Sequence, residues 1–203
     1  KAAYWYKLSA DQGFSLAQNN LGLLYYNGNG VEEDHDKAAE LFALAGEQGF
    51  AGARNNLGVM HIKGESVEQD YKEAYHLTWR QAKHGDARAQ YILGLMYKEG
   101  KGVEQNDMTA ARYLKLSARQ GYAPAQNALG LLYEHGRGVM PVSAKAAHWY
   151  EKAALQGNPE AKNNLGLMYL EGKGIARDYG EAARWLRPLA EEGYPQAQTA
   201  MGH

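Results

Sequence analysis

Apolar positions along the chain recur with a helical spacing, in repeats of 36 residues. In the stretch 17–26, Ala17, Leu21 and Tyr25 stand four residues apart, which places them on one face of a helix. No segment alternates apolar and polar residues with a period of two, so no strand is predicted. A Leu-Gly or Met-Gly dipeptide returns at the same step without insertion or deletion, at Leu21-Gly22, Leu57-Gly58, Leu93-Gly94, Leu129-Gly130, Leu165-Gly166 and Met201-Gly202. The pattern predicts an all-helical tandem array.

Each repeat is predicted to contain two helices joined by a glycine turn. The first helix ends at a Gly-x-Gly pair such as Gly28 and Gly30, because glycine readily adopts the left-handed conformation that ends helices. The second helix ends at a further glycine such as Gly49. Its expected N-cap residues have side chains that accept hydrogen bonds from free backbone N–H groups, and they are Asp34, Asp70, Asn106, Ser143 and Asp178.

The period divides the chain into one repeat domain over residues 1–203, with five full repeats between two partial ones. Residues 1–16 form a partial repeat with a second helix only, the full repeats are 17–52, 53–88, 89–124, 125–160 and 161–196, and residues 197–203 begin another. The outer repeats of such arrays normally present polar faces. Here Trp5 at one end and Met201 at the other are interior-type residues. We therefore expect a segment of a longer array, or terminal helices that leave room for end-to-end contact with another molecule.

Composition and charge exclude several classes of function. The chain has 22 basic and 23 acidic residues, so it has no strong field that would recruit nucleic acid. It has no cysteine, which excludes disulfides and thiolate chemistry. No run of 18 apolar residues predicts a membrane span, and the seven histidines form no His-x-x-x-His pair. The Gly-x-Gly turns follow helix C-termini, which is the wrong end for a phosphate loop. We expect no catalytic residue, no metal and no cofactor.

The repeat resembles the Sel1-like repeat family, whose members are relatives of the tetratricopeptide repeats. The resemblance rests on Ala125-x-x-x-Leu129-Gly130-x-x-Tyr133-x-x-Gly136-x-Gly138-Val139, followed by Lys145-Ala146-Ala147-x-Trp149-Tyr150-x-Lys152-Ala153-Ala154-x-x-Gly157. It implies a right-handed α/α superhelix, or solenoid, with the first helix of each pair on the concave side. It also implies a non-catalytic adaptor that binds a protein or peptide, and it favours a periplasmic or secreted location.

Two alternatives to a general adaptor follow from the same resemblance and the aromatic residues. One is a bacterial immunity or host-protein-binding protein that captures one specific partner. The other is a carbohydrate-binding module, which exposed aromatic side chains on the concave face would favour. Departures from the repeat pattern occur at His61, Ser66, Met140-Pro141-Val142 and Pro188, and we expect less regular geometry there.

Candidate binding residues come from the variable arc of the first helix. With the alanine at the start of each repeat as position 1, the changing positions 3, 4, 10 and 11 fall between about 180° and 300° on a helical wheel. Position 3 carries Asn19, Asn55, Tyr91, Asn127 and Asn163, and position 10 carries Tyr26, Ile62, Lys98, Glu134 and Leu170. Asparagines in a ladder suit hydrogen bonding to an extended peptide, and the apolar members would anchor it.

Position 7 lies within the same arc but is always aliphatic: Leu23, Val59, Leu95, Leu131 and Leu167. These residues either pack between neighbouring first helices or form an apolar floor for a ligand. The alternative for the whole arc is a solvated surface with the partner bound elsewhere.

Overall fold

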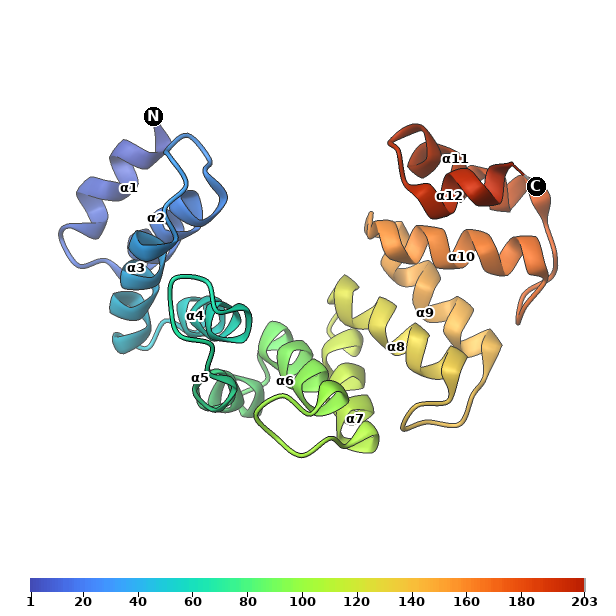
Figure 1. The fold of residues 1–203 in the computed structure, drawn as a ribbon, viewed down its shortest axis with the longest axis horizontal. Coiled ribbons are helices and arrows are strands. Elements are labelled where there is room, and N and C mark those ends of the chain that lie inside the picture. The colour runs from blue at the N-terminus through green and yellow to red at the C-terminus, as the bar shows by residue number, and fades with distance from the viewer. Residues whose placement is uncertain (203) are drawn as a thin grey trace. The chain divides into compact units, whose positions relative to one another are not determined.

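The computed structural model describes residues 1–202 and confirms the all-helical prediction, with twelve helices and no strand in that range (Figure 1). The first helices of the repeats are α2 (Ser15–Asn27), α4 (Ala51–Lys63), α6 (Ala87–Glu99), α8 (Ala123–His135), α10 (Pro159–Glu171) and α12 (Pro195–Met201). The second helices are α1 (Ala2–Ala10), α3 (His35–Glu47), α5 (Tyr71–Lys83), α7 (Asp107–Arg119), α9 (Ser143–Leu155) and α11 (Tyr179–Glu191).

The helices fall into two compact units, Lys1–Gln105 with α1 to α6, and Asn106 onward with α7 to α12. Within each unit every helix packs against the next one along the chain. Successive first helices also contact each other, α4 with α6 in the N-terminal unit and α10 with α12 in the C-terminal unit. Within each unit, these first helices therefore lie side by side and form a shared surface.

The glycines of four Leu-Gly dipeptides bring the two helices of their repeats into close contact: Gly22, Gly58, Gly130 and Gly166. A Cβ atom placed on Gly130 would lie 2.5 Å from the ring of Tyr150, and one on Gly166 would lie 2.5 Å from Leu186. Tyr150 and Leu186 are both fully buried. Because glycine has no side chain, it leaves a space on the first helix, and a large residue of the second helix fills that space.

The glycine turns have the left-handed conformation that the sequence predicts. The first glycine of each pair caps its helix, for example Gly28 with φ of 64° and Gly136 with φ of 70°. Ser66 takes the place of the second glycine and keeps the same conformation, with φ of 56°. It is the one residue other than glycine with positive φ among those described. The turn geometry is therefore set by the repeat, even where a serine must adopt it.

Pro188 leaves the second helix of its repeat uninterrupted. α11 runs from Tyr179 to Glu191 through Pro188, and the amide of Glu192 still bonds to the Pro188 carbonyl at 3.0 Å. Proline removes one N–H donor from the helix, and packing of the buried Leu186 and Leu189 on either side keeps the segment helical.

Four of the five expected N-caps are confirmed, and the fifth is wrong by one residue. Asp34, Asp70, Asn106 and Asp178 accept hydrogen bonds from their helices. In the fourth full repeat Val142 occupies the cap position, and Ser143 is the first residue of α9.

A backbone hydrogen bond explains the position of the cap. The amide of Val142 donates to the carbonyl of Tyr133 at 2.9 Å, and Asp34 and Asp178 make the same bond to Tyr25 and Tyr169. This bond to the preceding first helix fixes which residue becomes the cap, whether or not its side chain can accept a hydrogen bond.

Replacing Val142 with aspartate is expected to stabilise the chain by about 1 kcal/mol, because a carboxylate there would accept from the first turn of α9. Urea unfolding followed by circular dichroism measures the change. The matched variant Ser143→Ala should alter stability by less than about 0.5 kcal/mol. A larger loss in Ser143→Ala than gain in Val142→Asp would show that serine is the effective cap.

Candidate functional site

The predicted binding residues all lie on first helices, but their surroundings differ. Three of the asparagines at position 3 are buried, with Asn19 exposed by 6%, Asn55 by 1% and Asn163 by 5%. Tyr26, Ile62, Tyr91, Lys98, Asn127, Glu134 and Leu170 are half-buried. The two units thus each carry part of the predicted set.

The asparagine side chains form hydrogen bonds between neighbouring repeats. Asn56 donates from Nδ2 to Asn19 Oδ1 at 2.9 Å, and Asn164 donates to Asn127 Oδ1 at 3.1 Å. Asn55 donates to the N-cap carboxylate of Asp86 at 2.9 Å. These hydrogen bonds link neighbouring repeats, as is usual for buried polar groups. The amide oxygens of Asn55 and Asn163 are buried without a partner among the described residues.

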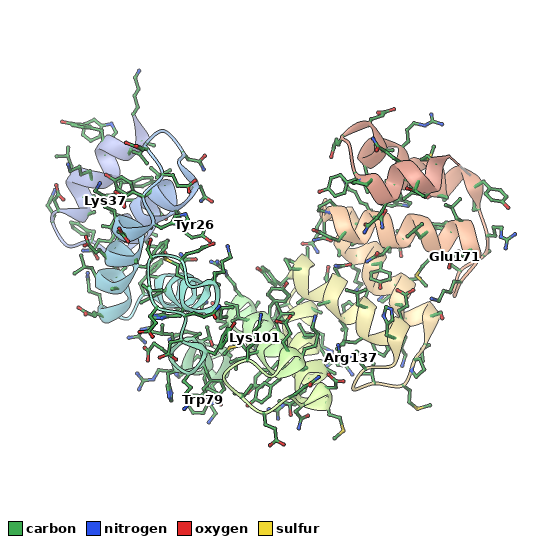
Figure 2. All side chains as sticks on the ribbon, in the orientation of Figure 1. Tyr26, Lys37, Trp79, Lys101, Arg137 and Glu171 are labelled. Atoms are coloured by element: carbon green, nitrogen blue, oxygen red, sulfur yellow. The ribbon has the colours of Figure 1, made fainter. Side chains whose placement is uncertain are left out.

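Tyr26 is held in a polar cluster between the first two full repeats (Figure 2). Its hydroxyl donates to Glu65 Oε2 at 2.6 Å and accepts from Lys63 Nζ at 2.7 Å, while its ring stacks on His35 with centroids 4.9 Å apart. Burial and the bond to Glu65 raise the pKa of Tyr26, which keeps its hydroxyl protonated. Burial alone would raise the pKa of Glu65. The hydrogen bonds from Tyr26 and Lys63 outweigh burial and lower this pKa below its usual value, so that the carboxylate stays ionised.

Glu134 makes the corresponding contact in the C-terminal unit. It accepts from Lys173 Nζ at 2.7 Å and from the Tyr150 hydroxyl at 2.6 Å. Burial disfavours the ionised form of Glu134, yet the hydrogen bonds from Lys173 and Tyr150 lower its pKa below the usual value. In both units, a position-10 side chain therefore bonds to the turn of the next repeat. Tyr26 bonds to Glu65, and Glu134 bonds to Lys173. Both of these partners are the middle residue of the three-residue turn that begins with the capping glycine.

An apolar pocket of about 210 Å³ lies between α4 and α6 in the N-terminal unit. It brings together Ile62 and Tyr91, which the sequence analysis singles out as apolar anchors. The lining residues are Val59, Ile62, Lys63, Tyr91, Ile92, Leu95, Met96, Glu99 and Lys101. Two position-7 residues, Val59 and Leu95, belong to this lining, so here they form part of an apolar floor.

A second pocket of about 280 Å³ adjoins the first, is more polar and carries two cationic side chains. Its lining residues are Leu23, Tyr26, Asn27, Asn56, Val59, Lys63 and Arg88. We call it the basic pocket. Val59 and Lys63 line both pockets. Figure 2 labels Tyr26 and Lys101, which belong to the basic and the apolar pocket respectively. Together these pockets form a continuous surface on α2, α4 and α6, which we call the first-helix face.

Arg88 is a binding candidate that the sequence analysis missed. It is half-buried and donates to Asn56 Oδ1, and within residues 1–202 no carboxylate lies within ion-pair distance of it. Its place one residue before Ala89 falls within the variable arc of the wheel. The helical wheel would have identified it had the numbering of positions begun one residue earlier in the repeat.

Three further pockets involve second helices. A more open one of about 450 Å³ lies among α3, α4 and α5 and has Leu57 and Gln81 in its lining. Gln81 Nε2 is buried without a partner. No group of three or more histidines and carboxylates in the described part of the chain is arranged to hold a metal ion. No helix described is both long and apolar enough to cross a membrane.

Similar proteins of known structure share this fold. A Sel1 repeat protein from Oxalobacter formigenes is 32% identical with a TM-score of 0.86, covering 98% of this chain and 58% of that one. A protective antigen present in uropathogenic Escherichia coli is 37% identical with a TM-score of 0.80, covering 97% of this chain and 42% of the antigen. This chain therefore spans about half the length of those two proteins.

An immunity protein from Pseudomonas aeruginosa is 25% identical with a TM-score of 0.58, and the match covers 96% of this chain and 73% of that protein. The comparison with curated protein sequences gave no match.

The Sel1 repeat sequence pattern matches residues 1–14, 15–50, 51–78, 87–122, 123–158 and 159–194. Those matches cover most of the chain, and each contains parts of the helix pairs described above. Proteins with these repeats are generally scaffolds for protein–protein interactions rather than enzymes. The chain belongs to the Sel1 repeat family.

Proposed function

We propose that this chain is a non-catalytic scaffold that binds an extended segment of a protein partner along its first-helix face. The observation that carries the proposal is the apolar pocket between α4 and α6, which Ile62 and Tyr91 line together. Its volume of about 210 Å³ suits one large apolar side chain of a partner. Binding energy in protein interfaces is concentrated where such an anchor enters a pocket.

The distribution of exposed aromatic residues favours a protein partner over a carbohydrate. Tyr4, Trp5 and Tyr179 are each more than 60% exposed, and they lie on the second helices α1 and α11. Stacking on sugars would require such rings on the binding surface. The first-helix face instead offers a half-buried Tyr91 beside aliphatic side chains, as a peptide anchor requires.

A narrower proposal is that the chain captures one specific protein, as an immunity or host-binding protein would. The similarity to a protective antigen of Escherichia coli and to an immunity protein of Pseudomonas aeruginosa supports it. A single partner would be recovered in fixed stoichiometry, whereas a general adaptor would bind several.

Replacing Ile62 with glutamine is expected to weaken partner binding at least tenfold, since it places an amide in the apolar pocket without changing charge. Affinity capture with quantitative mass spectrometry compares this variant with the wild type. Leu44→Gln, on the exposed side of the second helix α3, is the matched control and should retain the partner. A partner lost with Leu44→Gln but kept with Ile62→Gln would place binding on the second helices. Circular dichroism confirms that both variants fold.

A further inference from the structure

We propose that the partner segment on the first-helix face is acidic, with a carboxylate two or three residues from the apolar side chain that anchors it. This inference rests on the proposed function and specifies the chemistry of its ligand. The apolar side chain would enter the pocket between α4 and α6. The carboxylate would enter the basic pocket and bind Arg88.

The charges on the first-helix face leave one cation without a counter-charge. Lys63 pairs with Glu65 at 3.2 Å, and Lys101 and Lys98 both face Glu99, at 2.9 Å and 3.8 Å. Within residues 1–202, Arg88 has only the neutral amide of Asn56 as a partner. A cationic group that is half removed from water gains most from a charged acceptor.

The guanidinium of Arg88 also has the shape that carboxylate recognition needs. One of its Nη atoms bonds to Asn56, which holds the side chain against the wall of the basic pocket. The planar group has further N–H donors that a carboxylate can engage in pairs. Lys63 lines the same pocket and adds a second positive charge beside it.

The arrangement of the pockets sets the spacing of the two groups in the ligand. The apolar pocket lies between α4 and α6, and the basic pocket lies between α2 and α4 with Arg88 at its edge. Packed helices are about 8–10 Å apart, and an extended chain advances about 3.3 Å per residue. Two to three residues of an extended peptide therefore span the distance between neighbouring pockets.

The same features argue against a nucleic acid or a lipid. A phosphate backbone would need a row of cations, whereas here an apolar pocket adjoins the unpaired Arg88. A pocket of about 210 Å³ holds a side chain but not an extended acyl chain.

Selection from a phage-displayed library of random 12-residue peptides tests the inference. Wild-type protein should enrich peptides with Asp or Glu two or three residues from Leu, Ile, Met or Phe. Arg88→Glu should bind an enriched synthetic peptide at least tenfold more weakly. Arg80→Glu makes the same charge change on the exposed surface of α5 and should bind like wild type. Far-ultraviolet circular dichroism checks that both variants fold.

The outcomes separate this inference from the proposed function. If Ile62→Gln abolishes binding but the peptides lack acidic residues, or Arg88→Glu binds them equally well, the acidic specificity is wrong and the binding surface stands. If the peptides bind Ile62→Gln as they bind wild type, the first-helix face itself is the wrong surface. A library that yields no enriched peptide contradicts the acidic motif, as does a wild type that binds octanoate or an oligonucleotide but no peptide.

Discussion

Replacing Gly138 with alanine is expected to destabilise the chain by about 2–5 kcal/mol, well beyond the loss from the same replacement at Gly30. Both glycines are the second of a turn pair and have similar left-handed conformations, with φ of 66° and 73°. A Cβ on Gly138 would lie 2.0 Å from the carbonyl oxygen of Asp107, at the start of α7. A Cβ on Gly30 would meet nothing within 4 Å.

The comparison isolates the contact between neighbouring repeats. Gly30→Ala carries only the cost of left-handed alanine, about 1–2 kcal/mol. Gly138→Ala must also move the turn away from backbone atoms, which no change of rotamer can avoid. Urea unfolding monitored by circular dichroism measures both variants. Equal losses would mean that the turn does not press on α7 and that its glycine serves conformation alone.

Truncating Tyr150 to alanine is expected to cost about 3–5 kcal/mol, because the ring is fully buried against Gly130. Tyr150→Phe keeps the ring and removes only the hydroxyl that donates to Glu134. That variant should lose about 1.5–3 kcal/mol, the usual effect of removing one hydrogen bond to a charged group.

Tyr4→Ala is the matched control for Tyr150→Ala, since Tyr4 lies on a second helix and is 62% exposed. Its effect should stay within about 0.5 kcal/mol. Thermal and urea unfolding of the three variants provide the comparison. A phenylalanine variant as unstable as the alanine variant would show that the bond to Glu134, and not the packing of the ring, holds the repeat together.

The repeat pattern predicts the fold well because its glycines stand where the backbone needs a residue without a side chain. The glycine of a Leu-Gly dipeptide stands where two helices approach closely, as Gly130 and Tyr150 illustrate. Each turn glycine marks a left-handed residue. The predicted N-cap at Ser143 is wrong because the cap position depends on a backbone hydrogen bond from Val142 to Tyr133. The identity of the side chains does not reveal such a bond.

The binding surface is predictable only in part. A helical wheel gives the direction of a side chain but not the depth to which a neighbouring helix covers it. Asn19 and Asn55 lie in the variable arc, yet they are buried between first helices. The pairing of Ile62 with Tyr91 in one pocket, and the lack of a carboxylate near Arg88, depend on contacts between repeats. Such contacts are not visible in a single repeat.

Binding at the first-helix face is tested most directly by methyl NMR of the whole chain, titrated with the captured partner or an enriched peptide. The methyl groups of Val59, Ile62 and Leu95 should show the largest shift changes, because they line the apolar pocket. Leu44 and Leu77, on the second helices α3 and α5, should remain unchanged. Changes concentrated at Leu44 and Leu77, with the pocket methyl groups unmoved, would contradict binding at the first-helix face.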